Sequence, residues 1–152
     1  MRVSAKVDYA VRAAVELAAA EPGLTVKAEA IAAAQDIPRK FLDNILQGLR
    51  QAGIVESRRG PDGGHKLVQT PEEVSLADVI RAIDGPLANV GGRPPETFSP
   101  PGAAAPMRDI WIAVRASLRE VLEETTLADV VTGELPARVG ELTGSPGAWE
   151  RR

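Results

Sequence analysis

The sequence has 152 residues, 44% apolar and 26% charged, which suits a globular protein with one modest core; its net charge of −3 argues against nucleic acid unless basic residues cluster. It has no cysteine and one histidine, which excludes disulfides and cysteine-ligated clusters and leaves any zinc site short of ligands. No apolar run reaches the roughly 18 residues of a membrane helix, and charges interrupt any signal-peptide core, so we expect a cytoplasmic protein without metal or cofactor.

The first predicted element is a helix from Ser4 to about Ala20. Ser4 is a good N-cap, and apolar residues recur after it at helical spacing: Val7, Ala10, Val11, Ala14, Val15 and Ala18. Glu21, Pro22 and Gly23 should end the helix.

Two further helices should follow, joined by a tight turn. The first is expected from Thr25 to Ala34, and its alanines allow close packing. Asp36 tolerates a left-handed backbone better than most residues, which suits the turn. The next helix should begin with Pro38 in its first turn and stop at Gly53. This order indicates a helix-turn-helix.

The second helix of this pair has two distinct faces. Its apolar residues fall on one side: Phe41, Leu42, Ile45, Leu46 and Leu49. Its polar side carries residue types that contact bases or phosphates in a recognition helix: Arg39, Lys40, Asp43, Asn44 and Gln47. Taken alone, the pattern is more typical of an ordinary amphipathic helix with a solvated polar face.

A basic hairpin follows directly and favours DNA binding. Its predicted strands are Ile54–Arg58 and Lys66–Thr70, joined by the glycine-rich turn Arg59–His65. Glycines let peptide groups approach a surface, and paired arginines suit phosphates or a narrow minor groove. The candidate DNA contacts in this wing are Arg58, Arg59, Gly60, His65 and Lys66.

Beyond the wing, Ser75 and Asp78 resemble a capping box for a helix ending at Gly85. After a proline-rich stretch, a long helix from Met107 to Glu124 carries an apolar seam: Met107, Ile110, Trp111, Val114, Leu118, Val121 and Leu122. Such a seam must be covered, either by its own domain or, as we favour, by a partner subunit. Thr126 with Asp129 should cap one more turn.

We therefore predict a mainly α fold with a small β-hairpin wing: a winged helix-turn-helix domain plus a long dimerisation helix. The predicted regions are a DNA-binding domain (1–85), a linker or effector loop (86–106), a dimerisation helix with a terminal turn (107–132) and a flexible tail (133–152). A small-molecule effector, if one acts, is expected between the linker and the long helix near Trp111.

The chain resembles the Rrf2 family of bacterial winged-helix regulators over about 1–132. The matching segments are Met1–Lys6 with Tyr9 and Ala10, then Ile37–Leu49, Arg58–Pro61, Val74–Val79 and Thr126–Asp129. The resemblance implies a homodimer that binds palindromic operators in double-stranded DNA and usually represses. It also implies that Asp43 reads bases and that Arg59 enters the minor groove.

The chain departs from this family in its wing and its sensing residues. His65 stands where the family usually has tyrosine, and Asp62 where it has a wing glycine. Cluster-sensing members carry three cysteines between Gly85 and Trp111, and this chain has none. Other members use an acidic residue and a histidine on the first helix, where this chain has Asp8 and Arg12. Arginine cannot ligate iron, so no iron–sulfur cluster is expected.

Functions of other classes have little support in the sequence. A hydrolase needs a positioned base, and the single histidine lies in the expected wing loop, so we predict no enzyme. The alternative is a winged-helix module that acts mainly through protein partners, for example a metabolic enzyme. Steep salt dependence of DNA binding would separate the two, because a protein-only module lacks it.

Overall fold

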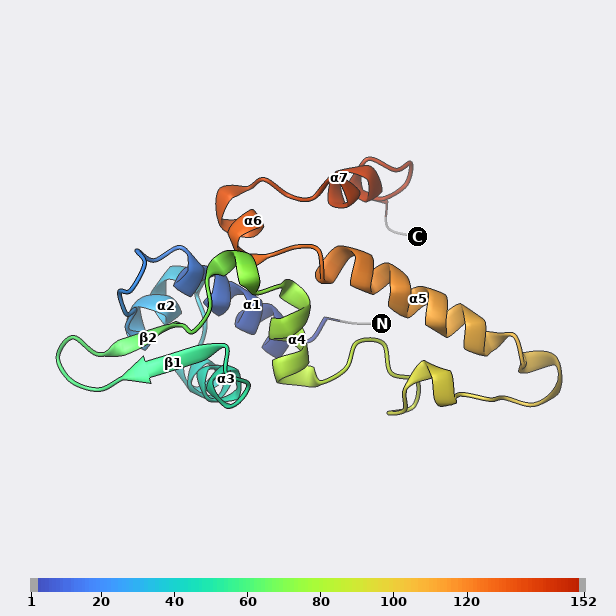
Figure 1. Cartoon of the computed structure of the whole chain (residues 1–152), viewed down its shortest axis with the longest axis horizontal. Helices are drawn as coiled ribbons and strands as arrows, with labels where there is room; N and C mark the ends of the chain where they lie inside the picture. The colour runs from blue at the N-terminus through green and yellow to red at the C-terminus, as the bar shows by residue number, and fades with distance from the viewer. Residues whose placement is uncertain (1–2, 151–152) are drawn as a thin grey trace.

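The computed structural model describes residues 3–150 and contains a helical body from which one long helix extends (Figure 1). Residues 1–2 and 151–152, at the ends of the first and last predicted regions, lie outside the described residues. The elements are α1 (Ala5–Ala18), α2 (Ala28–Gln35), α3 (Arg39–Gln51), β1 (Val55–Arg58), β2 (Gly64–Leu67), α4 (Leu76–Asp84), α5 (Met107–Leu122), α6 (Leu127–Thr132) and α7 (Ala137–Thr143). The mainly α fold with a two-stranded wing is confirmed.

The core forms around α1, which contacts α2, α3, α4 and α6. Alanines on α1 allow this close packing, and Ala10, Ala13 and Ala14 have no exposed surface. Leu127 of α6 is also fully buried, although it follows the long helix. Its backbone N–H donates to Val74 O at 2.9 Å, so the chain returns to the body after α5.

The helix caps predicted from the sequence are confirmed. Ser4 Oγ accepts from Val7 N at 3.1 Å and starts α1, which ends at Ala18 rather than near Ala20. Reciprocal capping boxes begin α4 at Ser75 and α6 at Thr126. Each cap satisfies backbone N–H groups that have no partner within the helix.

The turn between α2 and α3 also has the predicted geometry. Asp36 adopts the left-handed conformation with φ 50° and ψ 48°. Pro38 is the N-cap of α3, and Gly53 has a φ of 75° just beyond its end. The helix-turn-helix is therefore α2, Asp36 and α3.

The prediction of a helix beginning at Thr25 is wrong. Val26 instead pairs with β2 as an isolated bridge: Val26 N donates to His65 O, and His65 N donates to Val26 O, both at 2.8 Å. The second strand is also shifted, because it spans Gly64–Leu67 and pairs Ser57 with His65. His65 therefore lies within a strand and not in the predicted turn.

Two other predictions need correction. Phe41 was assigned to the buried face of α3, but it is 53% exposed and packs edge-on against Tyr9, with ring centroids 6.2 Å apart. It lies at the border of that face. The region predicted as a flexible tail (133–152) contains the helix α7, which contacts α5.

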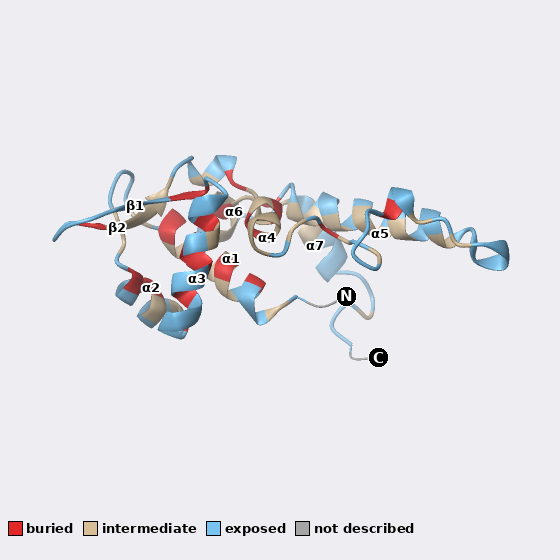
Figure 2. Ribbon diagram, turned by 90° about the horizontal axis from the view of Figure 1, so that it is seen from below, coloured by how far each residue is buried: buried red, intermediate tan, exposed pale blue. Residues whose placement is uncertain are grey.

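The long helix α5 has no buried residue along its whole length (Figure 2). The preceding segment contains two short 3₁₀ helices, Pro95–Thr97 and Gly102–Ala104, and the first of them contacts α5. Among residues 3–150, no helix is long and apolar enough to cross a membrane.

Candidate nucleic-acid interface

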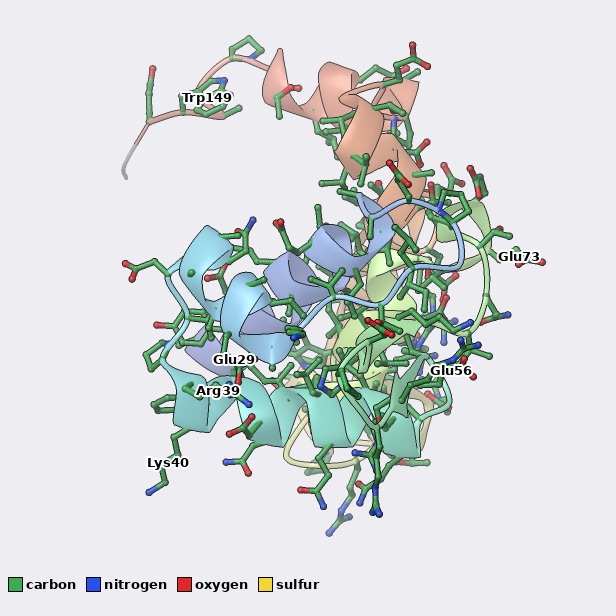
Figure 3. All side chains as sticks on the ribbon, turned by 90° about the vertical axis from the view of Figure 1, so that its left-hand side faces the viewer. Glu29, Arg39, Lys40, Glu56, Glu73 and Trp149 are labelled. Atoms are coloured by element: carbon green, nitrogen blue, oxygen red, sulfur yellow. The ribbon has the colours of Figure 1, made fainter. Side chains whose placement is uncertain are left out.

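The helix α3 presents a polar face on a rigid support. Leu42, Ile45 and Leu49 are fully buried and hold the helix against the body. The predicted contacts Arg39, Lys40, Asp43, Asn44 and Gln47 are all exposed on the other side. Lys40 points away from the body (Figure 3).

Arg39 is already paired within the protein. Its Nε donates to Asp43 Oδ1 at 2.8 Å, and its Nη1 forms a hydrogen-bonded ion pair with Glu29 of α2. The bond to Asp43, followed by that to Glu29, raises the pKa of Arg39, and the bond from Arg39 lowers the pKa of Glu29. The predicted DNA contacts Arg39 and Asp43 therefore bind each other, and together with Glu29 they form a cluster of one cation and two carboxylates.

Sequence reasoning missed Arg50 as a member of this face. Arg50 is exposed in the last turn of α3 and follows Arg39, Asp43 and Gln47 at helical spacing. Its spacing identifies it as part of the polar face, but it lies at the C-terminal end of α3, whereas the predicted contacts lie nearer the N-terminal end. The polar face therefore extends along the whole of α3.

The wing carries two free cations. Arg58 and Arg59 are exposed, and neither forms an ion pair with any residue between 3 and 150. Lys66 differs, because its side chain is only 23% exposed and its Nζ lies 3.0 Å from Glu56 Oε1. Arg58 and Arg59 are thus the wing charges available to a ligand.

The wing turn is held in place by the segment before α2. Thr25 Oγ1 donates to Asp62 O at 2.9 Å, and Gly63 N donates to Gly60 O at 2.9 Å. Gly60 has a φ of 104°, which favours glycine, whereas Asp62 needs no left-handed backbone. Asp62 is therefore compatible with the turn in place of the family's glycine.

His65, in the wing strand β2, is half-buried. Its Nδ1 is buried and has no hydrogen-bond partner among the described residues. Burial, followed by the positive charges of Arg50 and Arg39, lowers the pKa of His65. The ring is therefore neutral near pH 7 and adds no charge to the wing.

The predicted dimerisation seam lies outside the core. Ile110 is 50% exposed, and the other six seam residues are partly exposed. Leu118 and Leu122 line a cavity of about 350 Å³ together with Val7 and Ile80 of the body. Trp111, where an effector was expected, lines neither this cavity nor a second one between the linker and α5.

Asp8 and Arg12 of α1 are bound to each other and to the body. Arg12 Nη2 lies 3.1 Å from Asp8 Oδ2, and Arg12 Nη1 donates to Gln35 O at 2.9 Å. The Arg12 guanidinium also lies 5.0 Å from the centre of the Tyr9 ring. These contacts give Arg12 a structural role.

Comparison with known proteins assigns the chain to a family. Residues 3–133 match the family model Rrf2, described as "Iron-dependent Transcriptional regulator". A putative HTH-type transcriptional regulator of Mycobacterium tuberculosis is 49% identical over 150 residues, covering 99% of this chain and 93% of the relative. The HTH-type transcriptional regulator CymR of Bacillus subtilis is 31% identical over 132 residues, covering 87% and 91%.

Solved structures agree with this assignment. The structure described as CymR, "the Global Cysteine Regulator of B. subtilis", superposes with a TM-score of 0.74 at 30% identity, covering 88% of this chain and 98% of that one. IscR of T. potens gives 0.71 at 29% identity, covering 90% of each chain. The relatives are regulators and not enzymes, as predicted.

Iron does not fit the residues of this chain. Cysteine is absent from the sequence, and between residues 3 and 150 no three His, Asp or Glu side chains are grouped as metal ligands. The first-helix positions hold an Asp8–Arg12 ion pair instead. The resemblance therefore extends to the DNA-binding fold and not to the iron chemistry in the family's description. The chain belongs to the Rrf2 family of winged helix-turn-helix, DNA-binding transcriptional regulators.

Proposed function

We propose that the protein is a homodimeric cytoplasmic repressor that recognises palindromic operators without an iron–sulfur cluster. In each subunit, α3 enters the major groove and the wing follows the adjacent minor groove. The observation that carries the proposal is the position of the free cations Lys40, Arg58 and Arg59 on these two elements, in a chain whose net charge is −3.

The major-groove contacts come from the exposed face of α3. Asn44 and Gln47 have amide groups that pair with adenine, and Lys40 donates to guanine or phosphate. Arg39 and Asp43 act as a unit, because Asp43 holds the Arg39 guanidinium. A carboxylate in this place accepts from cytosine and disfavours other bases.

The minor-groove contacts come from Arg58, Arg59 and the peptide groups near Gly60. A narrow minor groove concentrates negative potential, which attracts arginine according to groove width. His65 and Lys66 stabilise the wing from within its strand β2, since His65 is half-buried and Lys66 pairs with Glu56.

The second subunit is recruited through α5. The apolar seam of α5 contains no buried residue. Covering it with a second copy of the chain would stabilise the dimer by about 25 cal/mol per Å² of apolar surface removed from water. Two recognition helices related by a two-fold axis read half-sites about one helical turn, or 10–10.5 base pairs, apart. Occupation of such an operator near a promoter would block transcription.

Selection of bound genomic fragments, followed by footprinting, tests this proposal. We expect an enriched palindrome, protected by two copies of the chain, and lower expression of a reporter placed behind it. A duplex with one half-site should bind far more weakly than the intact operator. Absence of any enriched sequence, with a protein partner captured instead, would favour the protein-only module and contradict the proposal.

A further inference from the structure

Three arginines converge on a cavity between α4, the following linker and α5. The cavity has a volume of about 360 Å³ and is lined by Arg81 of α4 and by Arg115 and Arg119 of α5. Apolar linker residues, including Leu87 and Pro94, form its remaining wall. Figure 1 shows the linker leaving α4 and running beside α5 at this point. The volume lies within the range of small-molecule sites.

We propose that this cavity binds a small anion that carries carboxylate or phosphate groups. Guanidinium groups match both chemistries, because their planar N–H donors pair with two oxygens at once. The lining contains three arginines and a single acidic side chain, Glu96. The lining side chains therefore carry a net positive charge, although Asp78 and Glu123, which are not part of the lining, pair with Arg81 and Arg119.

The arginines have unused hydrogen-bonding capacity. Arg115 Nη1 donates to Glu96 Oε2 at 2.6 Å, and Arg81 Nη2 donates to Glu123. Arg119 Nε lies 3.6 Å from Glu123 Oε1 and donates no hydrogen bond to any described residue. Each guanidinium has five N–H donors, so most of those at the cavity remain available to a bound anion.

The surroundings favour an anion over simple solvation. The Arg115 side chain is only 17% exposed, so its charge is less screened than that of a surface arginine. The Glu96 carboxylate accepts a hydrogen bond from the Glu96 backbone N–H and another from Arg115. These two bonds, in that order, lower the pKa of Glu96, which is therefore charged near neutral pH. An incoming anion competes with Glu96 for Arg115 and with Glu123 for Arg119, which is ion-paired to Glu123 at 3.6 Å but donates it no hydrogen bond.

An anion in this place would join the two functional parts of the molecule. Arg81 belongs to α4, which contacts the recognition helix α3, whereas Arg115 and Arg119 belong to the arm α5. Binding that draws these arginines together would couple the orientation of the arm to the DNA-binding body. This regulatory consequence rests on the proposed function, but binding of the anion does not.

Isothermal titration of the full chain with citrate and with inorganic phosphate, at constant ionic strength in chloride, tests the site. Wild-type protein should bind at least one of the two probes, and the preferred probe identifies the chemistry. Arg119→Gln should weaken that binding roughly tenfold or more, because a charged hydrogen bond is lost. Arg108→Gln is the matched control, since Arg108 lies on α5 outside the cavity and should bind as wild type does.

Failure of wild-type protein to bind either probe would overturn the proposal, as would equal binding by Arg119→Gln. Arg119 is 49% exposed in its side chain, so its replacement should leave the fold intact, which circular dichroism checks. The same probe is then added to the operator complex. If the probe changes the affinity of wild-type protein for the operator, and does not do so for Arg119→Gln, the site is also regulatory. If the protein does not bind DNA at all, the titration still tests whether the anion binds.

Discussion

Arg39 links the helix-turn-helix to its own carboxylates before any DNA is bound. Glu29 holds it from α2 and Asp43 from one turn further along α3. The recognition helix of the free protein therefore presents less positive charge than its sequence implies. In the proposed complex, phosphates or bases would compete with these carboxylates, and such competition would favour a correct operator over random DNA.

Replacing Asp43 with asparagine should reduce this discrimination. The variant keeps the side-chain shape, removes a negative charge that faces phosphates and weakens the hold on Arg39. Affinity for random duplexes should rise, and preference at one base pair should fall by about 1–3 kcal/mol. Anisotropy titrations against operator and random DNA measure both changes. Unaltered preference would mean that Asp43 reads no base.

The single histidine gives stability a specific pH dependence. His65 has a pKa below its ordinary value of 6.5, chiefly because it is buried. The unfolded chain therefore binds this proton more tightly than the folded chain. The contribution of neutral His65 is complete above pH 6.5 and is lost as pH falls below that value toward the folded pKa.

Urea unfolding of wild type and His65→Gln, at about pH 7.5 and about pH 5.5, measures this contribution. Wild type should lose more stability than the variant on acidification. The comparison is clean because the chain has no other histidine. An equal loss in both proteins would show that His65 does not titrate in this range.

At the level of elements, the wing depends on the extended segment before α2. A Cβ added to Gly64 would lie 2.6 Å from Val26 O, so no larger residue fits without moving that segment. Gly64→Ala should lower the free energy of unfolding by about 1–3 kcal/mol, as overpacking does. It should also weaken operator binding, because the wing shifts relative to α3.

Gly140→Ala is the matched control for this substitution. Gly140 lies within α7, and a Cβ there would meet nothing within 4 Å. The control should stabilise the chain slightly, by about 0.5–1 kcal/mol, because alanine favours a helix. The urea midpoints of Gly64→Ala and Gly140→Ala measure the two changes in stability, and the midpoint of Gly64→Ala should be the lower. Equal behaviour would show that the Val26 pairing does not constrain the wing.

The limits of sequence-based prediction follow from the range of each interaction. Caps such as Ser4, Ser75 and Thr126 act within three residues, so the sequence revealed the beginnings of α1, α4 and α6. The extended state of Val26 depends on His65, which is distant in the chain. Local propensity therefore predicted a helix from Thr25, whereas the pairing of Val26 with His65 holds this segment in an extended conformation.

The candidate site shows the same limit. The polar face of α3 was recognised from its period, although Phe41 lies at the border of the buried face and proved exposed. The pairing of Arg39 with Glu29 joins two helices and leaves no periodic signal. The cavity likewise joins Arg81 of α4 to Arg115 and Arg119 of α5, two segments that are distant in the chain, and it was not predicted.

For the whole molecule, the proposed dimer depends on the arm α5. Replacing Val114 and Leu118 with glutamate places charges in the apolar seam of α5, which a partner subunit would have to bury. Unpaired buried charges cost several kcal/mol, so we expect monomers. Analytical ultracentrifugation measures the mass, and anisotropy should show weaker operator binding.

Ile112→Glu provides the control for this experiment. Ile112 lies on α5 but is not one of the seam residues, so its replacement should leave the dimer intact. Circular dichroism establishes that all variants are folded. A folded Val114→Glu, Leu118→Glu variant that remains dimeric would place the subunit interface elsewhere.

The central claim is that α3 and the wing of this chain bind DNA. The most direct test is the salt dependence of operator and random-duplex affinity for wild type and Arg59→Ala. Arg59 is a free wing cation, so its removal should weaken binding to nearly all sequences and reduce the salt slope by about one charge. Arg93→Ala, which removes an exposed arginine of the linker, should match wild type. Wild-type and Arg59→Ala curves that coincide at every salt concentration would contradict the claim.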